Sequence, residues 1–288
     1  MKQIIPLALV LFMFLIPFSE AERTGFSDSS CDKNGQCTLE MYSYQKYYND
    51  KGEWKDINEG WSTRGCQQDY AYCNTANPQN YQAHVKSDIT QPESVLIITK
   101  EGERIAFTPT GLEDSRGVLS NIQSVTPRID GNQLVYTDIL PSTTLILKYL
   151  PHELKEELII AAPLPFVITG NLKFTNTFST TLAYNSNERK EEGSIDLMKD
   201  AVILARVPSP EADKREVMWD IRAGQLNLEV DYRSHDFNDG PLIVDPTLEL
   251  DFATMVQDGD VLLTNITPQL MTKNIGRDNL RVGITGCT

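Results

Sequence analysis

Short runs of alternating apolar and polar residues recur along most of the chain, separated by residues that favour turns. In residues 225–232 (QLNLEVDY) every second side chain is apolar, which is the period of a strand with one buried face. Runs of this kind follow one another from residue 81 onward at near-regular spacing. They cover residues 81–85, 94–99, 104–108, 133–136, 145–149, 156–160, 171–175, 180–184, 201–206, 216–221, 225–230 and 242–244. Many short strands in this order predict an all-β fold, specifically an antiparallel β-sandwich.

A further hairpin is predicted closer to the N-terminus. Residues 41–48 are rich in aromatics and roughly alternating, residues 49–52 (NDKG) favour a turn, and residues 53–57 lead out of it. Two such segments joined by a turn with glycine and asparagine are typical of a hairpin. Only residues 154–158 and 262–271 have patterns that could hold a helical turn or two.

The first residues of the chain have the three-part pattern of a secretory signal. Lys2 provides a positive charge, residues 4–18 form an uncharged apolar run, and small residues at 19 and 21 precede a cleavage site. The run is shorter than the about 20 residues that a membrane-spanning helix needs, although an uncleaved anchor is the alternative. We therefore expect a signal peptide, a secreted or cell-surface product, and no transmembrane segment after cleavage.

The chain contains five cysteines, and four of them lie near the N-terminus of the expected mature protein. These four are Cys31, Cys37, Cys66 and Cys73. An even cluster in an exported chain indicates two disulfides with three possible connectivities. A zinc site is the alternative, but the gaps of five and six residues within the two pairs differ from the usual C-x2-4-C spacing. Cys287 is left over as a free thiol, an intermolecular link, or one half of another pair.

These patterns divide the chain into four expected parts. Residues 1–21 are the signal peptide. Residues 22–80 are a cysteine- and aromatic-rich β subdomain stapled by disulfides, which ends in the loop 74–80 (NTANPQN). Residues 81–250 are the β-sandwich domain. Residues 251–288 are a C-terminal tail or the incomplete start of a second β module, because a whole β-sandwich module needs about 100 residues.

Charge and residue spacing exclude several classes of function. With 26 basic and 40 acidic residues, the formal net charge is −14, which argues against nucleic acid and against an anionic membrane as partners. His84, His152 and His235 are far apart in sequence, and no metal-ligand spacing, phosphate loop or Gly-x-Ser-x-Gly motif is present. We therefore expect no catalytic residues, no metal ligands and no cofactor. Asn265 lies in an Asn-x-Thr acceptor for N-glycosylation.

Aspartate-containing turns have two interpretations. Residues 236–240 (DFNDG) and 258–260 (DGD) carry clustered hard oxygen ligands that calcium prefers, but aspartate and asparagine are also the usual residues of tight turns. The turn interpretation is favoured. A separate pair, Asp245 and Pro246, should end the buried apolar strand 242–244, because proline cannot donate to a sheet ladder.

Three sequence blocks occur in an order that resembles a known family region. They are residues 47–57 (YYNDKGEWKDI), residues 134–160, which include YTDILPSTTLILKY and LKEELII, and residues 240–247 (GPLIVDPT). They resemble the β-rich N-terminal region of prokaryotic secreted or wall-associated proteins that precedes DNRLRE-type, disaggregatase-related modules or repeat arrays. Residues 257–261 and 278–283 are similar to the opening of such a module, which is classed as carbohydrate-binding. The resemblance implies cell-wall or extracellular polysaccharide, or other surface proteins, as partners.

Three functional hypotheses follow. The leading one is a non-catalytic extracellular surface or adhesion module that contacts carbohydrate through aromatic rings. The candidate rings are Tyr42, Tyr44, Tyr47, Tyr48, Trp54, Trp61, Tyr70 and Tyr72, and the alternative for them, which we favour, is that they fill a small disulfide-stapled core. The other hypotheses are a secreted polysaccharide hydrolase, which needs two facing carboxylates, and a structural subunit that assembles through sheet edges.

Overall fold

The computed structural model of the chain describes most of the residues between 27 and 250 and two short C-terminal segments. The described residues are 27–31, 37–42, 46–76, 81–184, 189–190, 195–208, 211–212, 217–222, 224–245, 247–250, 273–274 and 279–284. The expected signal peptide, the possible helical turn at 262–271 and Asn265 lie outside them. The chain divides into two compact units, one formed by Met1–Asp56 with Asp260–Thr288, the other by Ile57–Gly259.

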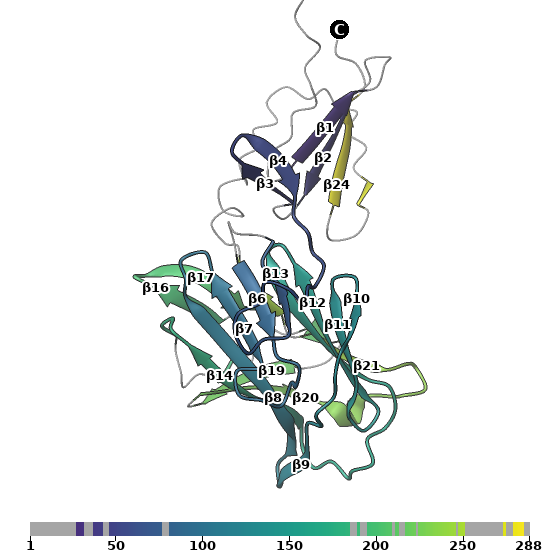
Figure 1. Cartoon of the computed structure of the whole chain (residues 1–288). Coiled ribbons are helices and arrows are strands. Elements are labelled where there is room, and N and C mark those ends of the chain that lie inside the picture. The colour runs from purple at the N-terminus through teal and green to yellow at the C-terminus, as the bar shows by residue number, and fades with distance from the viewer. Residues whose placement is uncertain are drawn as a thin grey trace, which may run out of the picture. The chain divides into compact units, whose positions relative to one another are not determined.

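The larger unit contains, in its described residues, two antiparallel nine-stranded sheets (Figure 1). The first, named here the β8 sheet, has the order β15 (Arg189–Lys190), β19 (Val217–Arg222), β20 (Gln225–Val230), β14 (Leu172–Thr180), β8 (Arg104–Asp114), β7 (Val95–Thr99), β6 (Tyr81–Val85) and β5 (Tyr72–Asn74), and β9 (Gly117–Asn121) pairs with β8.

The second sheet, named here the β12 sheet, has at its centre the successive antiparallel strands β11 (Gln133–Leu140), β12 (Thr143–Leu150) and β13 (Glu153–Ile160). Its order is β10 (Arg128–Asp130), β11, β12, β13, β22 (Thr247–Glu249), β17 (Val202–Val207) and β16 (Ile195–Lys199). In addition, β21 (Leu242–Asp245) pairs with β13 and with β18 (Glu211–Ala212). The only helical segment in the described residues is a 3-10 turn at Tyr232–Ser234. The prediction of an all-β, antiparallel sandwich is therefore confirmed.

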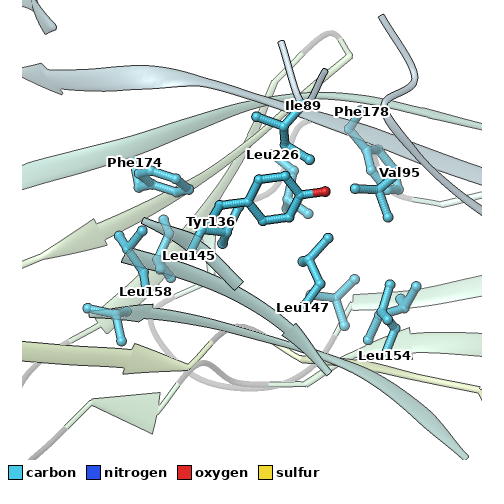
Figure 2. Close-up of a cluster of buried hydrophobic side chains, with 14 of the residues drawn as sticks. Ile89, Val95, Tyr136, Leu145, Leu147, Leu154, Leu158, Phe174, Phe178 and Leu226 are labelled. Carbon is cyan, nitrogen blue, oxygen red and sulfur yellow. The ribbon is translucent and has the colours of Figure 1, made fainter. Parts of the chain in front are cut away.

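The apolar faces of the two sheets pack against each other to form one core. Along β12 every second side chain is buried, beginning at Thr143, and along β13 the same alternation begins at Leu154. Figure 2 shows the facing side chains around Tyr136, and a single buried cluster contains residues of both sheets. The members labelled there are Ile89, Val95, Tyr136, Leu145, Leu147, Leu154, Leu158, Phe174, Phe178 and Leu226. The period-two pattern thus decides which face of each strand is inside.

Strand β13 changes its neighbour at the proline that follows β21. Leu158 pairs with Val244 of β21, whereas Lys155 pairs with Thr247 of β22. Strand β21 ends at Asp245, which agrees with the predicted end of this apolar strand. Residues 154–158, whose pattern could also hold a helical turn, lie in strand β13, along which buried and half-buried side chains alternate.

Two strands are longer than the sequence predicts. The predicted run 171–175 continues to Thr180 as β14, with a bulge after Thr175. The predicted strand 180–184 is wrong beyond Thr180, because of residues 181–184 only Ala183 pairs, in an isolated bridge with Met198. Strand β8 continues past the predicted end at residue 108 to Asp114. Within this extension Gly111 lies so close to β9 that a Cβ atom there would be 2.3 Å from the Ser120 carbonyl oxygen. A residue without a side chain is therefore required at position 111.

The smaller unit contains a four-stranded antiparallel sheet and a separate hairpin. The sheet has the order β1 (Ser27–Cys31), β2 (Cys37–Tyr42), β24 (Asn279–Ile284) and β23 (Lys273–Asn274), and the hairpin consists of β3 (Tyr47–Asp50) and β4 (Glu53–Asp56). A hairpin is present as predicted, with its second strand at Glu53–Asp56. The predicted first strand 41–48 is wrong in its bounds, because Met41 and Tyr42 belong to β2 and the strand of the hairpin is Tyr47–Asp50. The two-residue turn of the hairpin has positive φ at both Lys51 (56°) and Gly52 (95°), as a type I′ turn requires.

The two units divide the chain at residue 56 and not at the expected residue 80. Residues 57–76 belong to the larger unit, where β5 pairs with β6. In the smaller unit β24, from the expected C-terminal tail, pairs with β2 over six residues. Two of the four clustered cysteines, Cys66 and Cys73, are therefore part of the larger unit.

Candidate functional site

A disulfide between Cys66 and Cys73 closes a loop at the edge of the β8 sheet. This bond confirms the prediction of a disulfide in this part of the chain. Ser62 and Cys73 exchange two backbone hydrogen bonds of 2.8 Å each, so the outer edge of β5 is paired with a residue of the same loop. We call residues 62–73 the disulfide loop. The loop protects a sheet edge that would otherwise present free backbone groups.

The disulfide loop covers His84, which lies on the face of β6 that points away from the core. The backbone N–H of Gln67 donates to His84 Nδ1 (3.3 Å), and the ring centroids of Tyr70 and His84 are 5.8 Å apart. As a result His84 is only 1% exposed. Because Nδ1 accepts a hydrogen bond, the proton of the neutral ring resides on Nε2, and Nε2 has no hydrogen-bond partner in the described structure.

Burial, with a smaller contribution from the positive charge of Arg104, lowers the pKa of His84 to about 4. A buried imidazole cannot be hydrated in its charged form, so the neutral form is favoured. The side chain is therefore uncharged at neutral pH. It is a buried polar group with one unpaired nitrogen directly under the loop.

Beside the disulfide loop, side chains from several elements form a polar surface around Tyr70. We call this the Tyr70 surface and define it by Tyr70, Lys86, Glu93, Arg104 and Ser179. The Tyr70 hydroxyl donates to the Glu93 carbonyl oxygen (3.1 Å), and Lys86 Nζ lies 5.5 Å from the centre of the Tyr70 ring. Arg104 Nη2 is 3.5 Å from the Glu93 carboxylate, to which Ser179 Oγ donates (3.2 Å). A half-buried ring, two cations and one carboxylate thus share one area.

The strand order explains why these residues meet. Lys86 follows β6, Arg104 begins β8, and Ser179 lies in β14, which pairs with β8. Glu93 precedes β7 and has a positive φ of 51°, a backbone conformation that is uncommon for a residue with a side chain. Sequence analysis singled out only Tyr70 among these residues, because the others are isolated charged or polar residues until strand pairing brings them together.

The other aromatic candidates of the sequence analysis are distributed over both units. Tyr47 and Trp61 are buried, while Tyr48, Trp54 and Tyr72 are half-buried. Tyr44 and the side chain of Tyr42 lie outside the described residues. The large apolar side chains that are exposed in the described structure, Val118, Ile129, Val167 and Val202, include no aromatic residue. Among the described rings of the larger unit, Trp61 is buried, whereas Tyr70 is half-buried and contacts Glu93 and Lys86.

Two of the aromatic rings close one end of the sandwich core. Trp61 Nε1 donates to the Asn132 carbonyl oxygen (2.8 Å). The Tyr81 hydroxyl lies 2.6 Å from the carbonyl oxygens of both Leu150 and Glu153, so a residue of the β8 sheet is bonded to a hairpin of the β12 sheet. Buried hydroxyl and indole groups normally find such partners, and these contacts are structural.

Glu156 is a carboxyl group inside the sandwich. It is 8% exposed, and its Oε1 atom has no hydrogen-bond partner in the described structure. Burial, followed by the negative charge of Asp245, raises the pKa of Glu156 to about 8. Asp245 itself bonds to Lys155 (2.6 Å). Glu156 is therefore protonated at neutral pH, as expected for a carboxyl group in an apolar site.

A second carboxyl group, Asp114, is buried but fully paired. It accepts hydrogen bonds from Arg116 Nη2 (2.7 Å) and from the backbone N–H of Thr169 (2.9 Å). The hydrogen bond from Arg116 is the main reason that the pKa of Asp114 is lowered to about 2. Asp114 lies in the β8 sheet and Glu156 in the β12 sheet, and each is explained by its own local contacts.

The remaining candidates have local partners. His152 Nε2 lies 3.8 Å from the Glu153 carboxylate, and His235 Nε2 lies 2.9 Å from the Gly240 carbonyl oxygen. Asp236 Oδ1 accepts hydrogen bonds from the backbone and side chain of Asn238 (2.9 and 2.8 Å), which confirms the turn interpretation of residues 236–240. Residues 258–260 lie outside the described structure. In the part that is described, no group of three or more His, Cys, Asp or Glu is placed to hold a metal ion.

Three comparisons with known proteins gave no match. No protein-family model matches it, and no curated protein or solved structure is detectably similar to it. The described residues contain no helix that is both long and apolar enough to cross a membrane.

Proposed function

We propose that this protein is a non-catalytic extracellular surface or adhesion module that contacts carbohydrate through the Tyr70 surface. One observation carries the proposal: an aromatic ring, two cations and a carboxylate lie together beside a disulfide-closed loop on the outer face of a β-sandwich. The ring is half-buried, so that one part remains available to a ligand while the rest is packed.

The chemistry of the Tyr70 surface suits a sugar. An aromatic ring packs on the apolar face of a pyranose, while charged side chains form hydrogen bonds with its hydroxyl groups. Glu93 is held by Arg104 and Ser179, and Lys86 Nζ donates to the Pro92 carbonyl oxygen (2.8 Å). Groups that are already held in place lose less conformational entropy when a ligand binds.

The apolar run at residues 4–18, which sequence predicts to be an export signal, supports an extracellular location. The Cys66–Cys73 bond is compatible with an oxidising compartment. The three sequence blocks that resemble secreted and wall-associated prokaryotic proteins support polysaccharide as the partner. Together they favour a ligand in the cell wall or extracellular matrix.

Two sheet edges of the larger unit, at β10 and β5, are poorly suited to assembly through strand addition. The edge strand β10 has only three residues, all exposed, and carries an ion pair between Arg128 and Asp130 (2.9 Å). At the edge of the other sheet, β5 is paired with Ser62 of the disulfide loop. Short, charged or covered edges are the features by which β-proteins prevent strand addition.

Binding of the full-length protein to insoluble cell-wall polysaccharide tests the proposal. We expect Tyr70→Ala to weaken binding about tenfold, which is the effect of losing one stacked ring. The separate single variant Arg104→Ala should weaken binding by more than Tyr70→Ala does. Tyr48→Ala, in the separate β3–β4 hairpin, is the matched control and should bind like the parent protein. Tyr70→Phe retains the ring and should retain most of the binding. Equal binding by the parent, Tyr70→Ala and Arg104→Ala would refute carbohydrate contact at this surface.

A further inference from the structure

The pairing of β1 with β2 places two cysteines opposite each other. In the antiparallel register, Cys31 at the end of β1 is the partner of Cys37 at the beginning of β2. Residues 32–36 connect the two strands. This placement follows from the backbone register of the whole hairpin, in which five consecutive pairs are aligned from Ser27 with Met41 to Cys31 with Cys37.

From this register we propose a second disulfide, between Cys31 and Cys37. Directly opposed residues of an antiparallel pair have Cα atoms about 4.5 or 5.5 Å apart, and disulfides join Cα atoms that are about 4.4–6.8 Å apart. The hairpin therefore positions the two residues at a separation that a disulfide spans without movement of the backbone.

The Cys66–Cys73 bond supports the same conclusion independently. Four cysteines can be joined in three ways, and in only one of these is Cys66 bonded to Cys73. The remaining bond in that arrangement is the one between Cys31 and Cys37. The fifth residue, Cys287, is the competitor, because it follows Ile284 by three residues in sequence and Ile284 pairs with Cys37.

Formation of the bond needs an oxidant of a kind that oxidising compartments supply. The two thiols lose two protons and two electrons, and a protein disulfide or small-molecule disulfide is reduced to two thiols as the new S–S bond forms. The first exchange gives a mixed disulfide with one cysteine of the hairpin, and the thiolate of the other then displaces the carrier.

The bond has a structural role in the smaller unit. Strand β2 is paired on one side with β1 and on the other with β24. A cross-link between Cys31 and Cys37 fixes the β1–β2 hairpin and so preserves the strand on which β24 lies. Small sheets bury little apolar surface and commonly depend on such cross-links.

Tryptic mapping without reduction tests the proposal, because trypsin places Cys31, Cys37 and Cys287 in three separate peptides and leaves only Cys66 and Cys73 together in one. Cleavage after Lys33 separates Cys31 (peptide 24–33) from Cys37 (peptide 34–46), whereas Cys66 and Cys73 remain together in peptide 65–86 and Cys287 falls in peptide 282–288. The full-length protein is produced in an oxidising compartment, its free thiols are alkylated at acidic pH, and the digest is analysed by mass spectrometry.

We expect peptides 24–33 and 34–46 to be found joined, to separate on reduction, and peptide 282–288 to be alkylated. The control Cys287→Ser should leave the joined pair unchanged, and Cys31→Ser should abolish it. Peptide 34–46 joined to 282–288 in the parent protein would overturn the assignment. So would alkylation of both Cys31 and Cys37 in folded protein whose 65–86 peptide carries its internal disulfide.

Discussion

The interior of the sandwich and the space under the disulfide loop each hold one buried ionisable side chain, and the two groups are kept uncharged in opposite ways. Glu156, between the sheets, retains its proton because burial raises its pKa to about 8. His84, under the loop, lacks a second proton because burial lowers its pKa to about 4. The comparison shows that burial selects the neutral form of either group, whatever the sign of its charge.

The two regions differ in what closes them. Glu156 is enclosed by the apolar cluster of two sheets whose strands come from most of the larger unit. His84 is covered by a short loop that one disulfide and two backbone hydrogen bonds hold to β5. The interior therefore opens only when the unit unfolds, whereas the space under the loop can open locally.

The largest expected effect comes from the interior itself. Leu147 is fully buried and lies between Leu134 and Glu156 in the register of the β12 sheet. Leu147→Ala should lower the free energy of unfolding by about 3–4 kcal/mol, because it removes buried methyl groups and leaves a cavity. The control Ile146→Ala, at a half-buried position on the opposite face of the same strand, should cost about 1 kcal/mol. Urea denaturation measures both, and equal losses would contradict the assignment of the two faces.

The second prediction concerns the pH dependence that Glu156 creates. The folded pKa of about 8 lies above the ordinary value of 4.5, so between these values the unfolded chain releases a proton that the folded chain keeps. The stability that this group contributes is therefore fully present below pH 4.5 and is lost as the pH rises through about 8. Glu156→Gln should remove this loss and raise the free energy of unfolding, relative to the parent protein, by about 3 kcal/mol at pH 6.5.

Urea denaturation at pH 4.5, 6.5 and 8.5 measures this effect. The control Glu157→Gln, on the outer face of β13, should follow the parent protein. A Glu156→Gln variant that still loses stability between pH 4.5 and 8.5 as steeply as the parent would show that another group is responsible.

The third and smallest effect on stability comes from removing the Cys66–Cys73 disulfide, which should change the space around His84 and leave the interior around Glu156 unchanged. The double variant Cys66→Ser with Cys73→Ser should lose about 2 kcal/mol of stability, the chain-entropy value for a loop of this length. Its main effect is local: with the loop free to open, the pKa of His84 should rise from about 4 toward 6.5. In the parent, the stability contributed by neutral His84 is present above pH 6.5 and is lost as the pH falls through about 4.

An NMR titration of the His84 ring protons measures that pKa, with Cys287→Ser as the control for removal of a thiol. The pKa of Glu156 should be unchanged in the double variant, because the interior stays closed. A His84 pKa that remains near 4 after removal of the disulfide would show that packing of the loop alone keeps this residue covered.

Much of the fold could be predicted from sequence, because alternation and turn residues act locally. The bounds of β6 and β20 agree with the predicted runs, and each run is flanked by turn-forming residues. The extension of β8 was missed because it begins with Pro109 and contains Gly111, which are poor strand formers. Here the pairing of β8 with β9 and β14 stabilises the extended conformation. The intrinsic strand propensity of a residue does not determine its conformation where pairing with neighbouring strands does.

The buried titratable groups could be predicted only in part. In the sequence Lys155-Glu156-Glu157 the strand period requires the middle residue to share a face with Leu154 and Leu158, so an inward carboxyl group could have been found once the segment was assigned as a strand. The polar neighbours of Tyr70 had no such signal. Lys86, Glu93 and Arg104 meet only because of the order in which β6, β7 and β8 pair.

The pairing of β2 with β24 has a consequence for the order of folding. Residues that pair in these strands, such as Cys37 and Ile284, are more than two hundred positions apart in sequence, and closing so long a loop in an unfolded chain carries a large entropic cost. Once the intervening strands have folded into the larger unit, bringing β2 and β24 together costs less conformational entropy, because most of the chain between them is already ordered. The small sheet is therefore expected to form late, after the sandwich, and to report whether the polypeptide has folded through its whole length.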